Sequence, residues 1–183
     1  MSERVPLVVL GLGNVLLEDD GAGAAAVRLL LDRYEAPPEV SVLDGGTLGL
    51  SLLPYLESAG AVILVDAVMT GAEPGSLVRL DGDDVAPAVA ARLSPHQVGV
   101  ADLLDGARWL GRYPDHVVLL GVVPESMQLA VGLSPRVQAA LPELVDAVIN
   151  EARALGFVFP SKSSDDSPAP NCSFDVSRLA GMR

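Results

Sequence analysis

The sequence predicts an α/β fold: a single three-layer domain in which helices cover both faces of a mostly parallel, twisted sheet of about five strands. Apolar, β-branched runs alternate with segments of helical periodicity, the pattern of successive βαβ units. The length of 183 residues favours one domain with a buried core. Strands are expected at 5–11, 40–47, 61–68, 75–82 and 115–126, and helices at about 21–35, 48–58, 98–110 and 135–156.

The first strand and helix follow from the stretch "VPLVVLGLGNVLLEDDGAGAAAV". Its continuous apolar run is typical of a strand buried on both faces, and the run ends at Gly11. After the acids, apolar side chains from Val27 to Tyr34 recur at i, i+3, i+4 and i+7, which gives the helix one apolar face. The prolines of "APP" at 36–38 end this helix.

The later elements are predicted by the same patterns. The third strand is the most apolar segment of the chain and carries one acid, Asp66, near its C-terminal end. The fourth strand is short and is expected at an edge of the sheet. Pro54 lies within the second helix, where an interior proline is unfavourable. The final helix has an apolar stripe at helical spacing, and Gly156 is a fitting C-cap.

Composition excludes several classes of partner. The formal net charge of −12 repels phosphate backbones and anionic lipid, so neither nucleic acid nor a membrane is expected as a partner. The single cysteine, Cys172, rules out an intramolecular disulfide. The N-terminal apolar run is too short for a signal peptide, and no apolar run has the ~18 residues of a membrane span. These features predict a cytoplasmic protein with one domain at 1–158; a Ser-, Asp- and Pro-rich composition predicts a disordered tail at 159–183.

Polar residues gather where the predicted strands end. In an open parallel sheet, ligands bind at the carboxyl ends of the strands, so these side chains are expected to share one rim. His96, in "SPHQ", precedes a predicted helix and can reach the same rim. The polar residues that follow the strands are Asn14, Glu18, Asp19, Asp20, Asp44, Asp66 and Glu125.

The Gly-x-Gly at Gly11 and Gly13 invites a comparison with dinucleotide-binding loops. The third glycine of that fingerprint would fall at position 16, which is Leu16. Three acids beside the pyrophosphate position would also repel it. An NAD-binding enzyme is therefore disfavoured, and the two glycines are explained by a tight turn from strand to helix.

Each candidate also has a purely structural interpretation. Asp19 or Asp20 is expected to cap the helix that follows, although three adjacent acids exceed that need. Asp44 is as well explained by a hydrogen bond within its own Gly-Gly turn as by function. His116 starts a strand, which places it at the opposite rim in a structural or exposed position. Asp66 is harder to dismiss, because burying even a neutral polar group without a partner costs about 2–7 kcal/mol.

Taken together, carboxylates from the first loop and from Asp66, with the imidazole of His96, form a plausible ligand set for a divalent transition metal with positions left open. A lone histidine is more often a loop or core residue than a ligand, so the inference depends on the combination. Without thiolates such a site would bind a metal modestly. It fits a metal carried by another molecule better than a resident one.

These motifs resemble those of the hydrogenase maturation endopeptidases, which remove the C-terminal extension of the [NiFe]-hydrogenase large subunit. The resemblance covers roughly residues 6–156. It is carried by five motifs in order: "GLGNVLLEDDGAG", "LDGGTLG", "VDAV", "LSPHQVGVADLL" and "LLGVVPES".

The resemblance implies site residues and a partner. The acid before Gly21, Asp20, together with Asp66 and His96, would contact nickel and carry the catalysis. The segment formed by Asp44, Gly45, Gly46 and Thr47 would recognise the substrate. The partner would be the large-subunit precursor, whose own nickel serves as the recognition element, and no permanent cofactor is expected.

The resemblance leaves two questions of function open. The shared metal would either activate water or polarise the scissile carbonyl; alternatively, the carboxylates would act as general bases while nickel positions the substrate. A non-enzymatic, nickel-binding chaperone that docks on the precursor is the alternative to an endopeptidase.

Overall fold

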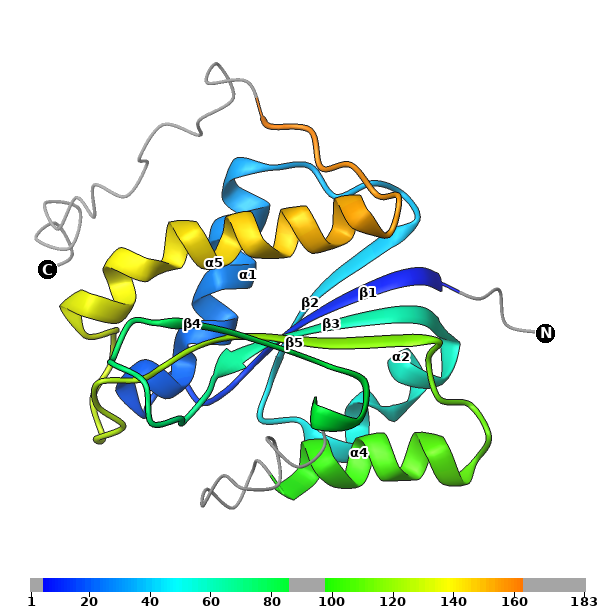
Figure 1. Ribbon diagram of the computed structural model, residues 1–183, viewed down its shortest axis with the longest axis horizontal. Helices are drawn as coiled ribbons and strands as arrows, with labels where there is room; N and C mark the ends of the chain where they lie inside the picture. Colours follow the sequence, from blue (N-terminus) through cyan, green and yellow to red (C-terminus); the bar gives the residue numbers. More distant parts are fainter. Residues whose placement is uncertain (1–4, 86–97, 163–183) are drawn as a thin grey trace, which may run out of the picture.

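The sheet has five strands, of which four run parallel. The computed structural model describes residues 5–85 and 98–162. The strand order is β2-β1-β3-β5-β4, and β4 pairs antiparallel with β5 at one edge (Figure 1). The strands are β1 (Val5–Leu12), β2 (Val40–Gly46), β3 (Ala59–Ala67), β4 (Leu77–Asp81) and β5 (His116–Val122).

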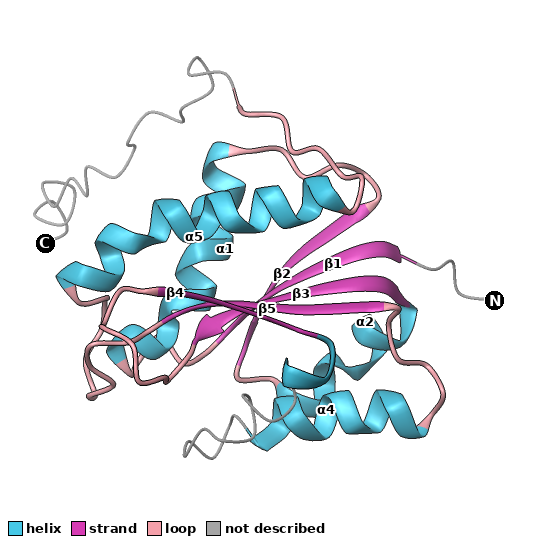
Figure 2. Ribbon diagram, in the orientation of Figure 1, coloured by secondary structure: helices cyan, strands magenta, loops and turns pink. Residues whose placement is uncertain are grey.

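Helices cover both faces of the sheet and make three layers (Figure 2). Helices α1 (Ala22–Arg33) and α5 (Pro135–Ala154) lie on one face, and α2 (Leu53–Ser58) and α4 (Val98–Trp109) on the other. Alternate residues of β1 serve the two cores. Leu7 and Val9 pack in the cluster with α1 and α5, whereas Val8 and Leu10 pack in the cluster with α2 and α4. Both faces are buried, which explains the continuous apolar runs.

The predicted fold class is confirmed, including the five strands and the helices on both faces. The structure adds detail at the two helical prolines. Pro54 does not break its segment because it occupies the first turn of α2, after the short 3-10 helix η2 (Gly49–Leu52). Pro142 lies inside α5, where the buried stripe of that helix continues on both sides of it.

Glycines allow α1 to approach the sheet closely. A Cβ atom on Gly23 would overlap the carbonyl oxygens of Leu12 and Val65, at the ends of β1 and β3. A Cβ atom on Gly11 would lie 2.5 Å from the carbonyl oxygen of Gly23. Backbone therefore meets backbone at this contact. The start of α1 is held directly against the carboxyl ends of the two central strands.

The folded chain continues past residue 158, the end of the predicted domain. Phe159 is buried in the core beside α1 and α5. Ser161 forms a β-bridge with Tyr34, and the backbone N–H of Lys162 donates to the carbonyl of Arg33. Residues 163–183 lie outside the described part of the chain, so the predicted tail stays a prediction.

The edge between β4 and α5 is tied by an ion pair. The Arg79 guanidinium donates to both carboxylate oxygens of Glu151, at 2.9 and 3.0 Å. These hydrogen bonds to Glu151, with one to Asp81, raise the pKa of Arg79 above its ordinary value. Within residues 5–85 and 98–162, no helix combines the length and apolar character needed to cross a bilayer.

The glycine contact makes a prediction about stability. Gly23→Ala should lower the free energy of unfolding by at least about 2 kcal/mol, because the new methyl group would meet rigid backbone. Gly71→Ala is the matched control, since nothing lies within 4 Å of its Cβ position, and it should change stability by less than about 0.5 kcal/mol. Urea unfolding followed by circular dichroism measures both. Equal stability of the two variants would contradict the close contact.

Candidate functional site

The loop after β1 and the carboxyl end of β3 build the site. We call residues 13–21, between β1 and α1, the acid loop; it ends in the 3-10 helix η1 (Glu18–Gly21). The loop requires unusual backbone conformations, with a φ of 111° at Gly13 and of 49° at Glu18. A positive φ at a non-glycine residue costs energy that its surroundings must offset. The local backbone is therefore set by what the loop contacts.

Asp20 lies buried at the end of the acid loop. Its Oδ2 accepts a hydrogen bond of 2.8 Å from the backbone N–H of Asn14, so the carboxylate folds back over the start of its own loop. Gly13 must be a glycine at this point, because a Cβ atom there would overlap the carbonyl oxygen of Asp20. The predicted tight turn after β1 is confirmed.

Asp66 is the second buried carboxylate, one residue before the end of β3. Its Oδ1 accepts a 2.7 Å hydrogen bond from the backbone N–H of Ala67. The same oxygen lies 3.6 Å from the position of a Cβ atom on Gly13. Asp66 therefore borders Gly13, whereas the Asp20 carboxylate binds the next residue, Asn14. The structure brings these two acids to one short piece of chain.

The position of this pair in the sheet is the one expected for a ligand site. From β1 the chain crosses to β2 on one side and then returns to β3 on the other, so β1 and β3 flank a switch in strand order. Open α/β sheets bind ligands at the carboxyl ends of strands at such a point. Asp20 follows β1, and Asp66 lies one residue before the end of β3.

The histidines fall in different parts of the chain. His96, the predicted third ligand, lies outside the described residues. In the described ranges, no group of three His, Cys, Asp or Glu side chains is placed to hold a metal ion. His116 is exposed at the start of β5, at the opposite rim, as the sequence indicated. The structure thus describes two of the three predicted ligands, Asp20 and Asp66, and the metal site stays a prediction.

Asp44 makes the hydrogen bond within its own Gly-Gly turn that the sequence indicated as its structural explanation. Its Oδ1 accepts 3.1 Å from the backbone N–H of Gly46, and its side chain is exposed near the end of β2. The turn also contacts the acid loop, because the N–H of Gly13 donates 3.0 Å to the carbonyl of Gly46. The segment 44–47 is therefore attached to the acid loop. Thr47 is exposed at its end.

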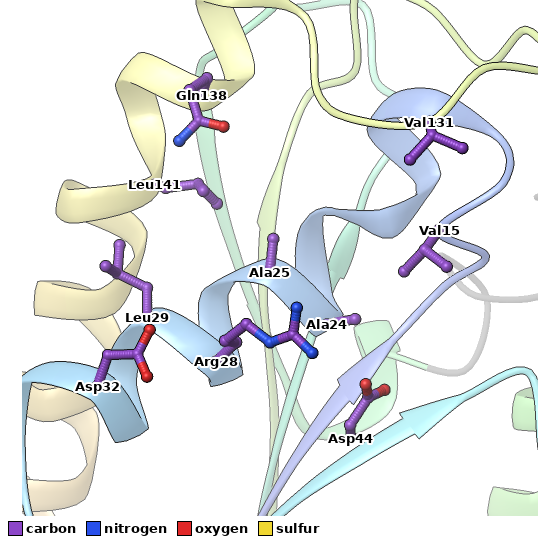
Figure 3. A pocket seen from close by; sticks show the side chains of 10 residues that line it. All are labelled: Val15, Ala24, Ala25, Arg28, Leu29, Asp32, Asp44, Val131, Gln138 and Leu141. Carbon is purple, nitrogen blue, oxygen red and sulfur yellow. The ribbon is translucent and has the colours of Figure 1, made fainter. Parts of the chain in front are cut away.

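A pocket of about 540 Å³ opens beside this turn, between α1 and α5 (Figure 3). Val15 of the acid loop and Val131 stand at one end of it, and Asp32 at the other. The guanidinium of Arg28 extends into the pocket toward Asp44. The walls are thus apolar with a few charges, as in many ligand sites. Sequence patterns did not indicate this pocket, because its walls come from segments that lie far apart in the sequence.

Asp19 has a role that the sequence did not indicate. The expectation that Asp19 or Asp20 caps α1 is wrong: Gly21 is the N-cap residue, without a side-chain capping bond. The 3-10 helix η1 directly precedes α1, and it directs both carboxylates away from the N-terminal N–H groups of α1. Asp19 is buried and accepts three backbone hydrogen bonds, from Glu125 (2.9 Å), Ser126 (3.0 Å) and Ser134 (2.7 Å).

Comparison with known proteins decides the family. The family model described as "Hydrogenase maturation protease" matches residues 24–151. The chain belongs to the hydrogenase maturation protease family. The hydrogenase 2 maturation protease of Escherichia coli is 36% identical over 151 residues, which span 82% of this chain and 92% of that protein. The hydrogenase expression/formation protein HupD of Rhodobacter capsulatus is 40% identical over 156 residues, 84% of this chain and 73% of HupD.

Solved structures agree with the family assignment. The hydrogenase maturating endopeptidase HybD of E. coli superposes with a TM-score of 0.83 at 35% identity, over 88% of this chain and 99% of HybD. The [NiFe] hydrogenase maturation protease HybD of Thermococcus kodakarensis gives 0.66 at 27% identity, over 80% and 99% of the two chains. This member of the family is accordingly a peptidase. The sequence-based resemblance is confirmed at the level of family, fold and enzyme class.

The contact at Gly13 makes a prediction about activity in this maturation protease. Gly13→Ala should reduce the processing rate by about 100-fold or more, since the new methyl group would overlap the carbonyl oxygen of Asp20 and force the acid loop to rearrange. Gly111→Ala is the control: its φ of 65° is also positive, but nothing lies within 4 Å of its Cβ position. It carries backbone strain without the clash, and should keep the rate within about threefold. Rates are measured by release of product from a hydrogenase precursor. An unchanged rate for Gly13→Ala would refute the placement of the active site at the acid loop.

Proposed function

We propose that this protease removes the C-terminal extension of a [NiFe]-hydrogenase large-subunit precursor that already contains nickel, and that Asp20, Asp66 and His96 bind that nickel. The observation that carries the proposal is a pair of buried carboxylates that lie next to consecutive residues of the acid loop. Asp66, from β3, lies beside Gly13, and Asp20 accepts a hydrogen bond from Asn14. Carboxylates at the carboxyl ends of neighbouring parallel strands are suitable ligands for a divalent cation.

The donor set fits nickel as part of the substrate. Two carboxylates and one imidazole leave positions open for donors from another molecule. On this proposal the precursor supplies both the metal and the remaining ligands. A precursor without nickel would lack the link to the acids and would escape cleavage, so the enzyme would act only after metal insertion.

The segment 44–47 is proposed to contact the precursor. Support comes from its attachment to the acid loop through Gly13 and Gly46, and from the pocket beside Asp44. The hydrogen bond between Asp44 and Gly46 fixes the turn, which presents the exposed Thr47 at the same rim. A structural role of Asp44 in its turn and a recognition role of the whole segment are therefore compatible.

Two chemical schemes remain compatible with this site. In one, the metal polarises the scissile carbonyl or activates water. In the other, Asp20 or Asp66 acts as the general base and nickel only positions the substrate. Exchange of nickel for zinc in the precursor separates the schemes. A change in kcat at unchanged KM favours metal chemistry, whereas a change confined to KM favours the positioning role.

The carboxylates are tested by isosteric replacement. Asp20→Asn and Asp66→Asn each retain one oxygen that can accept from Asn14 or Ala67, so the fold should persist. Each variant should lower the rate on nickel-loaded precursor at least about 100-fold, because a neutral amide is a poor ligand and a poor base. Asp146→Asn, on the exposed side of α5, is the matched control and should leave the rate unchanged. His96→Gln should behave like the two acid variants.

The metal requirement is tested with the unaltered enzyme. Nickel-loaded precursor should lose its C-terminal peptide, detected by mass spectrometry, while nickel-free precursor should stay intact. Equal cleavage of both forms would refute nickel-based recognition. Stable binding of the precursor without release of a peptide would refute the proposed cleavage of this extension.

A further inference from the structure

We infer that Asp19 is a positioning residue: its carboxylate holds the loop 124–134 against the acid loop and so fixes one wall of the substrate site. We call residues 124–134, between β5 and α5, the clamped loop. The inference rests on the proposed function, in which the precursor binds beside Asp20 and Asp66.

The clamp consists of four hydrogen bonds. Oδ2 of Asp19 accepts from the backbone N–H groups of Glu125 and Ser126, at 2.9 and 3.0 Å, and Oδ1 accepts from that of Ser134 at 2.7 Å. The backbone N–H of Asp19 donates to the carbonyl of Ser126 at 3.2 Å. Hydrogen bonds to a buried carboxylate are charge-assisted and are stronger than neutral ones. Both ends of the clamped loop are thus attached to one side chain.

The middle of the clamped loop lies against the acid loop. Ala130 and Leu17 form a parallel β-bridge. The N–H of Ala130 donates to Leu16, and the N–H of Glu18 donates to Ala130, at 3.1 and 3.0 Å. These bonds place the middle of the clamped loop beside residues 16–18 of the acid loop. Asp19 closes both ends of this contact.

Apolar side chains of the clamped loop then face solvent beside the site. Leu129 and Val131 are 83% and 84% exposed, so these apolar side chains contribute little to the buried core. Val131 also forms one end of the 540 Å³ pocket together with Val15 of the acid loop. Exposed apolar side chains at a pocket mouth are typical of a binding surface. A side chain of the precursor's extension would pack between these two valines.

The two neighbouring acids therefore do different work. Both oxygens of the Asp19 carboxylate point to N–H donors of the clamped loop, whereas that of Asp20 points back to Asn14. Asp19 acts on the substrate through the clamped loop and does not bind nickel. Loss of the clamp should weaken precursor binding while the nickel requirement persists.

The test compares kinetic constants of Asp19→Asn and Ser134→Ala. The asparagine keeps the shape but replaces one acceptor oxygen by a donor, so at least one clamp bond is lost. KM for nickel-loaded precursor should rise about tenfold or more, with kcat within about threefold of the unaltered enzyme. Ser134→Ala removes the hydroxyl that caps α5 by accepting from Val137, but it keeps the N–H that Asp19 binds. Its KM should stay unchanged. Equal KM values for these two variants would show that Asp19 is merely structural and would overturn the inference.

A second arm begins with a variant that leaves Asp19 unaltered. Val131→Ser changes an exposed side chain, so the fold should persist, and KM should rise at least about threefold. In the double variant with Asp19→Asn, the two effects should combine to less than their product, because both act on one wall. An unchanged KM for Val131→Ser, or fully multiplicative effects, would overturn the inference. Equal cleavage of nickel-free precursor by the unaltered enzyme would refute the proposed function while leaving these KM comparisons valid.

Discussion

Burial of carboxylates at one end of the sheet is the constraint on which this site depends. In the described part of the chain, the buried polar or charged side chains are Asp19, Asp20, Asp66 and Ser134, and all four belong to this region. A buried carboxylate is costly unless hydrogen bonds or opposite charge compensate for lost water. Backbone N–H groups supply compensation for each acid. The loops adopt the shapes that bring those N–H groups to the acids.

The apolar layers provide the rigid base for this arrangement. Gly23 lets α1 touch the ends of β1 and β3. The acid loop, which connects β1 to α1, therefore has both of its ends held in place. The positive φ of Glu18 shows that the loop accepts an unfavourable backbone conformation. Strain of this kind persists only where surrounding contacts determine the structure. The clamped loop and the turn at Gly46 provide such contacts.

Sequence patterns predicted the fold well because each element has a strong local signal. Continuous apolar runs marked the central strands, and helical stripes marked α1 and α5. Once the strands are parallel, their carboxyl ends must meet, so the rim positions of Asp20 and Asp66 followed as well. The contacts of these acids could not be predicted. The hydrogen-bond partners of Asp19 lie more than 100 positions away in the sequence, and no local sequence pattern predicts them.

The error about helix capping has the same origin. Asp19 and Asp20 precede a helix, where caps are common, and propensity alone favours that role. A 3-10 turn before α1 changes the direction of each successive side chain. The two adjacent acids then bind different partners: Asp19 accepts from the loop 124–134, and Asp20 accepts from Asn14 in its own loop. Tertiary hydrogen bonds, which local sequence does not encode, decide between them.

The weakness of the proposed metal site is consistent with its use. A complete set of protein ligands would bind free nickel. An enzyme with its own nickel could not distinguish nickel-loaded precursor from nickel-free precursor. Two carboxylates and one histidine bind modestly on their own and leave coordination positions open. On the proposed function, recognition would therefore require the precursor to contribute both metal and ligands. On this argument the buried acids are preorganised by backbone hydrogen bonds, so little ordering remains to be done when the nickel arrives.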